Sequence, residues 1–317
     1  MARMPDADAV PRPPLPLRIR LRRKLEVVGA RGLAWAVRRS SRARSLAMAD
    51  SLARTACRMP FMRVHLNYAR EQLEWVFGTD LSPVEREEVL ANSVRNLART
   101  MVDFLRFPGY SRADMEALLA GVEGEEHFRA FQQSDAGAVI GFGMHLGSWE
   151  YAGVWLAMQG PMVAVGKAQR EAAITNMAVD IRTGSGIDHI LANDNTNRKL
   201  ITTLRRKDHA VLGLIADQNG GRDGVWVPLF GRLASCLKGP GFLMRRYDVP
   251  GMLIIAVWEG DRYRVIVGPR IETVKTDNAD HDLLVNTARI QAMYERMMRR
   301  FPEQWLWLHR RWRSEDE

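Results

Sequence analysis

GAVIGFGMHLGSWEYAGVWLAMQGPMVAVG, residues 137–166, contains the strongest structural pattern in this 317-residue chain. Its segment 138–144 is an apolar run bounded by glycines and too short for a helix, which predicts a buried strand. Residues 151–158 predict a buried helix, and residues 162–165 predict the next strand. Two strands joined by a helix form a βαβ unit. We therefore expect an α/β fold with a mostly parallel central sheet flanked by helices.

The only Asp, Glu, Lys, Arg or His side chains in this stretch are His145 and Glu150. His145 falls at the carboxyl end of the first predicted strand, where ligands bind in open α/β sheets. Residues five apart in a helix point about 140° from each other, because each residue turns by about 100°. The two side chains can therefore meet only if His145 precedes the helix, in a turn that Gly147 and Ser148 permit.

A carboxylate that bonds one ring nitrogen of His145 fixes the tautomer and raises the basicity of the other nitrogen. We therefore predict that Glu150 orients His145 as a general base that takes a proton from a hydroxyl. A histidine that a neighbouring acid satisfies for stability alone is the alternative, and these residues do not decide between the two. Ser148 fits a helix cap better than a nucleophile.

Residues 145–150, HLGSWE, after an apolar strand resemble the H-x4-E motif of the bacterial lipid A biosynthesis acyltransferases, the late lauroyl and myristoyl transferases. The wider glycerolipid acyltransferase superfamily usually carries H-x4-D, so Glu150 favours the lipid A branch. Further similar segments downstream are GLIADQNGG, VWVPLFGRLASCLKGPGFLMRR and QWLWLHRRWR. The resemblance extends from about Glu71 to Arg313.

This resemblance implies transfer of a fatty acyl chain from acyl carrier protein to a hydroxyl of a lipid A precursor, without a cofactor or a metal. It implies His145 and Glu150 as the catalytic pair. The candidate substrate-binding residues are Lys167, Arg170, Arg182, Asp217 and Gln218. Two alternatives stay open: an acyltransferase with a lysophospholipid or another glycolipid as acceptor, and a catalytically degenerate membrane-associated scaffold.

The positive charge of the chain is concentrated near its N-terminus. Residues 1–70 contain 16 Lys or Arg against 4 Asp or Glu, a net charge of +12, whereas the remainder has 30 against 33, a net charge of −3. Such an excess favours an anionic membrane surface or nucleic acid as partner. No recognised nucleic-acid module or base-stacking platform accompanies the charge, so we expect the membrane surface and no nucleic acid.

The sequence predicts three segments. Residues 1–16 are rich in Pro and Ala without apolar periodicity, which predicts disorder. Residues 17–62 predict basic amphipathic helices that lie on a membrane interface, although an arm that packs on the catalytic domain would have the same pattern. Residues 63–317 form the predicted acyltransferase domain. Many relatives carry an N-terminal membrane helix, but no run here reaches the roughly 20 apolar residues that span a bilayer. We expect peripheral attachment to the cytoplasmic face of the inner membrane.

The rest of the chain contains weaker local patterns. Ser82, followed by Pro83 and Glu85, predicts a helix start with a capping box. Residues 210–215 predict a third buried strand. Residues 235–246 predict a helix, and residues 252–267 predict a β-hairpin. The two cysteines lie far apart without disulfide or metal spacing, which favours a reducing setting.

Overall fold

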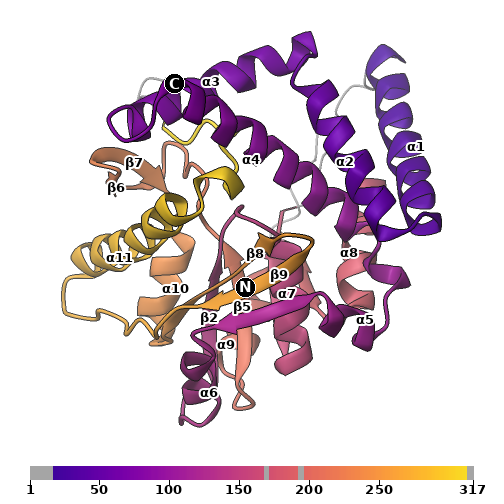
Figure 1. The fold of residues 1–317 in the computed structure, drawn as a ribbon. Coiled ribbons are helices and arrows are strands. Elements are labelled where there is room, and N and C mark those ends of the chain that lie inside the picture. The colour runs from indigo at the N-terminus through magenta and orange to yellow at the C-terminus, as the bar shows by residue number, and fades with distance from the viewer. Residues whose placement is uncertain (1–16, 168–170, 192–195, 313–317) are drawn as a thin grey trace.

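The computed structural model describes residues 17–167, 171–191 and 196–312. Its centre is a seven-stranded sheet with the order β1-β9-β8-β2-β5-β3-β4, flanked by helices (Figure 1). The five strands from β8 to β4 are mutually parallel, whereas β9 runs antiparallel to β8. The expected α/β fold with a mostly parallel sheet is confirmed.

The strands are β1 (Leu119–Glu123), β2 (Ala138–Gly143), β3 (Met162–Gly166), β4 (Asp188–Leu191), β5 (Ala210–Ile215), β6 (Val225–Leu229), β7 (Arg232–Cys236), β8 (Gly251–Glu259) and β9 (Arg262–Val267). The main helices are α1 (Leu17–Arg39), α2 (Arg42–Ala56), α3 (Arg63–Phe77), α4 (Pro83–Phe104), α5 (Arg112–Ala117), α6 (Glu125–Gln132), α7 (Trp149–Gln159), α8 (Ala172–Gly184), α9 (Thr196–Leu204), α10 (Gly239–Tyr247) and α11 (Ala279–Arg300).

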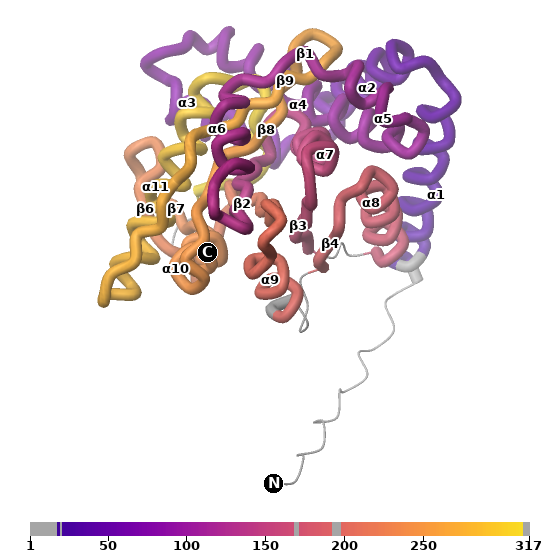
Figure 2. The backbone as a smooth tube through the Cα atoms, turned by 90° about the horizontal axis from the view of Figure 1, so that it is seen from below, coloured from indigo at the N-terminus to yellow at the C-terminus, as the bar shows by residue number. Residues whose placement is uncertain are grey.

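The predicted βαβ unit forms from β2, α7 and β3. Val139, Ile140 and Phe142 of β2 are fully buried, because helices cover both faces of the sheet (Figure 2). Strands buried on both faces are apolar throughout rather than alternating, which is why this run was readable in the sequence. The predicted hairpin is confirmed as β8 and β9.

The sequence analysis did not predict four of the strands, namely β1, β4, β6 and β7. β1 and β4 are the edge strands of the main sheet, and both are short and only partly buried. β7 contradicts the helix predicted from residue 235, because residues 232–236 pair with β6 in a separate antiparallel sheet and α10 begins only at Gly239. Short strands with mixed side chains carry little periodic signal, so pairing rather than local pattern defines them.

The N-terminal helices contact the rest of the fold unequally. The buried face of α2, which includes Leu46 and Ala49, packs against α4, and Arg42 pairs with the buried Asp103 at 2.7 Å. In contrast, α1 lies at the outer edge of the molecule (Figure 2). It carries exposed apolar side chains. Within the part of the chain that the structure describes, no helix is long and apolar enough to cross a membrane. Residues 1–16, for which the sequence predicts disorder, lie outside the described residues.

Helix α4 begins as predicted and ends over the candidate site. Ser82 and Glu85 form the reciprocal capping box, with Pro83 in the first turn. Near the other end of the helix, the Thr100 hydroxyl donates a hydrogen bond to the Gly147 carbonyl at 2.9 Å. The helix thereby holds the turn that follows β2.

Candidate active site

His145 and Asp217 are brought together by the register of two parallel strands. β2 and β5 pair so that Gly143 lies opposite Ile215. His145 and Asp217 each follow two residues after these paired positions. The His145 Nδ1 atom lies 2.8 Å from Asp217 Oδ1, and the His145 backbone N–H donates to Asp217 Oδ2 at 2.9 Å. Two contacts from one carboxylate fix both the ring and the backbone of His145.

The partner predicted for the His145 ring was therefore wrong. We expected Glu150 to bond the ring, but Asp217 makes that bond, and Glu150 instead receives two hydrogen bonds from Arg182, at 2.9 and 2.6 Å. The spacing within the H-x4-E motif showed only that the two side chains could meet. A carboxylate that is 72 residues away in sequence occupies the position beside the ring.

The turn between β2 and α7 has the features that the sequence predicted. Gly147 has a φ of +60°, and an added Cβ would lie 2.2 Å from the Ala256 carbonyl oxygen, so only glycine fits this position. Ser148 is buried, and its hydroxyl accepts a hydrogen bond from the Tyr151 N–H at 3.4 Å. Ser148 is the helix cap, as expected.

Asp217 remains a carboxylate although it is fully buried. Burial by itself raises the pKa of Asp217, but the charge and hydrogen bonds of His145 and a bond from Trp305 outweigh it and hold the pKa below its ordinary value. The Trp305 Nε1–H donates to Asp217 Oδ2 at 2.8 Å. The side chain that we had placed among the substrate-binding candidates is thus enclosed by protein donors.

His145 becomes a stronger base than a free histidine. Burial lowers its pKa, but the charge of Asp217 and the hydrogen bond to Asp217 raise it, and the charge of Glu150 adds to this, so that the pKa lies above its ordinary value. The side chain is 22% exposed. With the Nδ1 proton directed at Asp217, the Nε2 atom has the lone pair that can accept a proton.

A second charged cluster lies beside this pair. Arg182, at the end of α8, binds Glu150, lies 5.7 Å from the centre of the Phe104 ring and contacts His189 Nε2 at 3.1 Å. Burial lowers the pKa of His189 and the charge of Arg182 lowers it further, so His189 is the neutral acceptor of that contact. An added Cβ at Gly166 would lie 2.7 Å from His189 Nε2, so this glycine leaves room for the cluster.

Of the remaining predicted residues, the structure describes Lys167 and Gln218. Lys167 directly follows β3 and is exposed, and Gln218 is half-buried next to Asp217. Arg170 lies outside the described residues. The structure therefore brings together His145, Glu150, Arg182 and Asp217 from the predicted set.

The C-terminal segment, residues 304–311, completes the site in a way that the sequence analysis missed. The Leu306 N–H donates to the His145 carbonyl, and the Gly147 N–H donates to the Gln304 carbonyl, both at 3.0 Å. Gln72 of α3 in turn accepts from the Arg311 N–H and donates to the Trp307 carbonyl, each at 2.8 Å. Tryptophans interleaved with arginines, as in QWLWLHRRWR, suit either a lipid interface or core anchors. Trp305 and Trp307 are fully buried and are core anchors.

Cys236 is not placed for nucleophilic chemistry. The side chain is fully buried, and burial raises the pKa of the thiol although the nearby Arg311 partly opposes this effect. A buried neutral thiol is a poor nucleophile.

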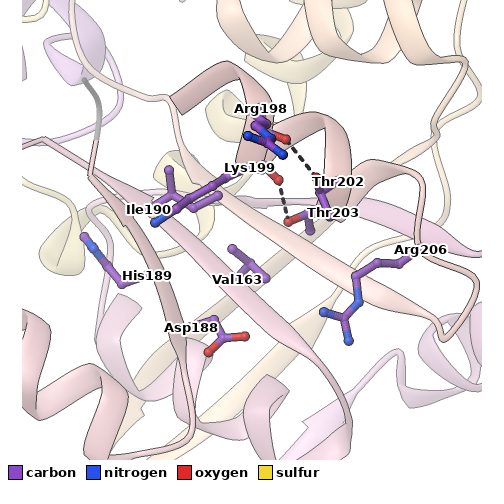
Figure 3. A pocket seen from close by; sticks show the side chains of 9 residues that line it. All are labelled: Val163, Asp188, His189, Ile190, Arg198, Lys199, Thr202, Thr203 and Arg206. Atoms are coloured by element: carbon purple, nitrogen blue, oxygen red, sulfur yellow. Dashed lines mark hydrogen bonds between the residues drawn. The ribbon is translucent and has the colours of Figure 1, made fainter. Parts of the chain in front are cut away.

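A surface hollow of about 640 Å³ lies beside the edge strand β4, between the sheet and α9 (Figure 3). Its lining residues are Val163, Asp188, His189, Ile190, Arg198, Lys199, Thr202, Thr203 and Arg206. Neither His145 nor Asp217 lines it, so this hollow is separate from the histidine site.

The chain is similar in sequence to known proteins over most of its length. Residues 29–314 match the family model described as bacterial lipid A biosynthesis acyltransferase. The chain is 24% identical over 259 residues to a lipid A biosynthesis palmitoleoyltransferase of Escherichia coli (strain K12), covering 80% of this chain and 81% of the relative. A lipid A biosynthesis acyltransferase of Shigella flexneri matches with the same identity and coverage. The chain belongs to the family of bacterial lipid A biosynthesis acyltransferases and is an acyltransferase of lipid A biosynthesis.

Proposed function

We propose that this acyltransferase moves a fatty acyl chain from acyl carrier protein to a hydroxyl of a lipid A precursor, with His145 as general base. The observation that carries the proposal is the 2.8 Å contact between His145 Nδ1 and Asp217 Oδ1. This contact leaves Nε2 available for the acceptor hydroxyl and places a counter-charge behind the ring. A histidine oriented by a buried carboxylate is the arrangement that general-base catalysis needs.

The reaction needs no acyl-enzyme. The acceptor oxygen attacks the thioester carbonyl carbon while its proton moves to His145 Nε2. The carbon–sulfur bond then breaks, and the leaving thiolate takes the proton back from the imidazolium as a thiol. Asp217 stabilises the imidazolium between these steps. The buried Cys236 and the capping Ser148 are unsuited to compete as nucleophiles.

Glu150 and Arg182 act beside the base in this proposal. The negative charge of Glu150 raises the pKa of His145, and Arg182 neutralises Glu150 in turn. A guanidinium within this cluster is also suited to the negative charge that develops on the thioester oxygen in the transition state. Removing either member of the pair changes the charge around His145.

The acyl carrier protein is proposed as donor because the family resemblance implies it. Such carriers are acidic, and the exposed Lys167 directly follows β3 at the carboxyl edge of the sheet. An exposed cation there would raise the association rate of an acidic partner. Charge reversal at Lys167 should therefore raise the KM for the carrier-linked donor and leave kcat unchanged.

Attachment to the cytoplasmic face of the inner membrane is proposed through α1. The helix exposes apolar side chains at spacings of four, three and seven residues, namely Leu21, Leu25, Val28 and Trp35, with exposed fractions of 52%, 70%, 66% and 60%. Arginines flank this stripe along the same helix. Apolar side chains bordered by cations suit the interface of an anionic membrane.

The direct test is acyl transfer by the purified protein from acyl carrier protein to a lipid A precursor, with mass analysis of the product lipid. We expect one acyl chain to be added with the carrier-linked donor and little transfer from coenzyme A. His145→Ala should lower the rate by about 10²–10⁴-fold without loss of fold. Wild-type turnover by this variant would contradict the general-base role. Transfer to a lysophospholipid and not to the lipid A precursor would contradict the proposed acceptor.

A further inference from the structure

A groove between α1 and α8 lies apart from the histidine site. The two helices lie side by side at the edge of the molecule (Figure 2), and the space between them measures about 870 Å³. We call it the α1–α8 groove. It is lined by Arg31, Ala34, Trp35, Arg38, Arg39, Pro108, Ala173, Asn176, Met177, Asp180 and Ile181.

The charge of the α1–α8 groove is positive. Three arginines of α1 line it, against the single carboxylate of Asp180. Arg38 donates to the Leu105 carbonyl at 2.7 Å, and the Arg39 guanidinium lies 4.7 Å from the centre of the Trp35 ring. Among the described residues, neither Arg31 nor Arg39 pairs with a carboxylate. Guanidinium groups that lack carboxylate partners are suited to bind a phosphate.

Apart from Asn176, the rest of the lining is apolar, and it joins the exposed stripe of α1. Met177 and Ile181 of α8 line the groove together with Ala34 and Trp35 of α1. Trp35 also belongs to the stripe that includes Leu25 and Val28, so the groove opens on the apolar surface of the helix. A ligand that satisfies both features has an anionic group attached to an apolar chain. A free nucleotide or inorganic phosphate would leave the apolar lining uncovered.

We propose that the α1–α8 groove binds the head group of an anionic membrane phospholipid. Its phosphate lies among the arginines of α1, and its glycerol and first acyl carbons lie against the apolar side chains of both helices. The inference rests on the proposed membrane contact of α1 but not on the acyl-transfer reaction. One bound lipid would hold α1 and the catalytic domain to the same membrane surface, because the other wall of the groove is α8.

The test distinguishes a specific lipid-binding site from non-specific electrostatic attraction between α1 and anionic lipid. Dihexanoyl phosphatidylglycerol, kept below its micelle concentration, is titrated into the full-length protein by calorimetry. We expect saturable binding of one lipid, with much weaker binding of dihexanoyl phosphatidylcholine. Arg31→Gln should weaken the phosphatidylglycerol affinity about tenfold, since one charge-assisted hydrogen bond is lost.

Two further variants decide the interpretation. Asn176→Trp, at an exposed position on the α8 wall, should fill the groove and reduce binding at least tenfold without any change in α1. Arg22→Gln removes one charge from α1 outside the groove, at a side chain that is 74% exposed, and should leave the affinity unchanged. Equal effects of Arg22→Gln and Arg31→Gln, or unchanged binding by Asn176→Trp, would overturn the site. Absence of soluble-lipid binding would overturn it too, even if vesicles still bound α1.

Discussion

At the scale of single residues, the chemistry depends on how Asp217 changes His145. The free ring nitrogen is active only when His145 is deprotonated. Asp217 raises the pKa of His145, so the rate should increase with pH through an ionisation above the ordinary histidine value. This raised pKa gives a strong base, with part of the enzyme protonated near neutrality.

Asp217→Asn tests this directly. The substitution removes the charge that raises the pKa of His145, so the rising limb of the kcat profile should move to lower pH. The plateau should fall by about 10²-fold or more, because the imidazolium loses its counter-charge. The measurement is kcat against pH, with Asp208→Asn at the surface as the matched control. A profile that keeps its wild-type midpoint would exclude Asp217 as the partner that sets the basicity of His145.

Glu150 and Arg182 call for a double-mutant cycle. Glu150→Gln leaves the largely buried Arg182 without its acid, which should cost about 3–5 kcal/mol of unfolding free energy and most of the activity. Glu150→Gln combined with Arg182→Gln should recover much of the stability, because no buried charge then lacks a partner. Urea unfolding and turnover are measured on all four proteins. Recovery of turnover along with stability would show that the pair is only structural.

At the scale of a single element, the C-terminal segment holds the catalytic turn from outside the βαβ unit. It bonds the His145 and Gly147 backbone and the Asp217 carboxylate, although it lies more than 80 residues from Asp217 in sequence. Gln72 holds the segment on the opposite side. The segment therefore joins α3 to the edge of the sheet where the chemistry takes place.

Trp305→Phe should distinguish the role of Trp305 in positioning Asp217 from its role in core packing. The ring remains, but Asp217 Oδ2 loses the 2.8 Å hydrogen bond from the indole nitrogen. We expect kcat to fall about tenfold, in line with one lost hydrogen bond to a charged group, with KM for donor and acceptor unchanged. Trp307→Phe is the matched control, because its indole bonds the Pro302 carbonyl and not the site. If both variants lose equal activity, general destabilisation explains the result.

At the scale of the whole molecule, the two N-terminal helices differ in role: α2 contributes to the folded core, whereas α1 is the proposed membrane contact. α2 is part of the core assembly, through Leu46, Ala49 and the Arg42–Asp103 pair. α1 presents apolar side chains to the outside. A truncation of both helices would therefore leave Asp103 buried without its cation and confuse stability with membrane binding.

Point substitutions in α1 give the cleaner experiment. Leu25→Ser combined with Val28→Ser should weaken binding to anionic vesicles about tenfold or more, because each buried apolar side chain contributes about 1.5 kcal/mol or more. Binding of the wild type should also weaken as salt is raised, since ions screen the arginines. Sedimentation with vesicles measures both effects. Val84→Ser, at a position on α4 that is 68% exposed, is the control. Unchanged vesicle binding by the double variant would remove α1 from the membrane interface.

The local sequence alone was enough to predict the elements that depend only on neighbouring residues. The apolar runs of β2, β3 and β5, the cap at Ser82, the turn at Gly147 and the hairpin of β8 and β9 were all predicted, because each depends on neighbouring residues. The same holds for His145 at the end of β2. Burial on both faces of the sheet made these strands continuous and apolar, and therefore recognisable.

Only the tertiary structure decided which side chain faces the His145 ring. The choice between Glu150 and Asp217 depends on the register of β2 against β5, and no spacing within one segment encodes the register of two strands 72 residues apart. The bond from Trp305 arises for the same reason, because the chain returns to the sheet edge only after α11. Residue identity and local periodicity are local properties of the chain, whereas the meeting of three distant segments follows from how the whole core packs.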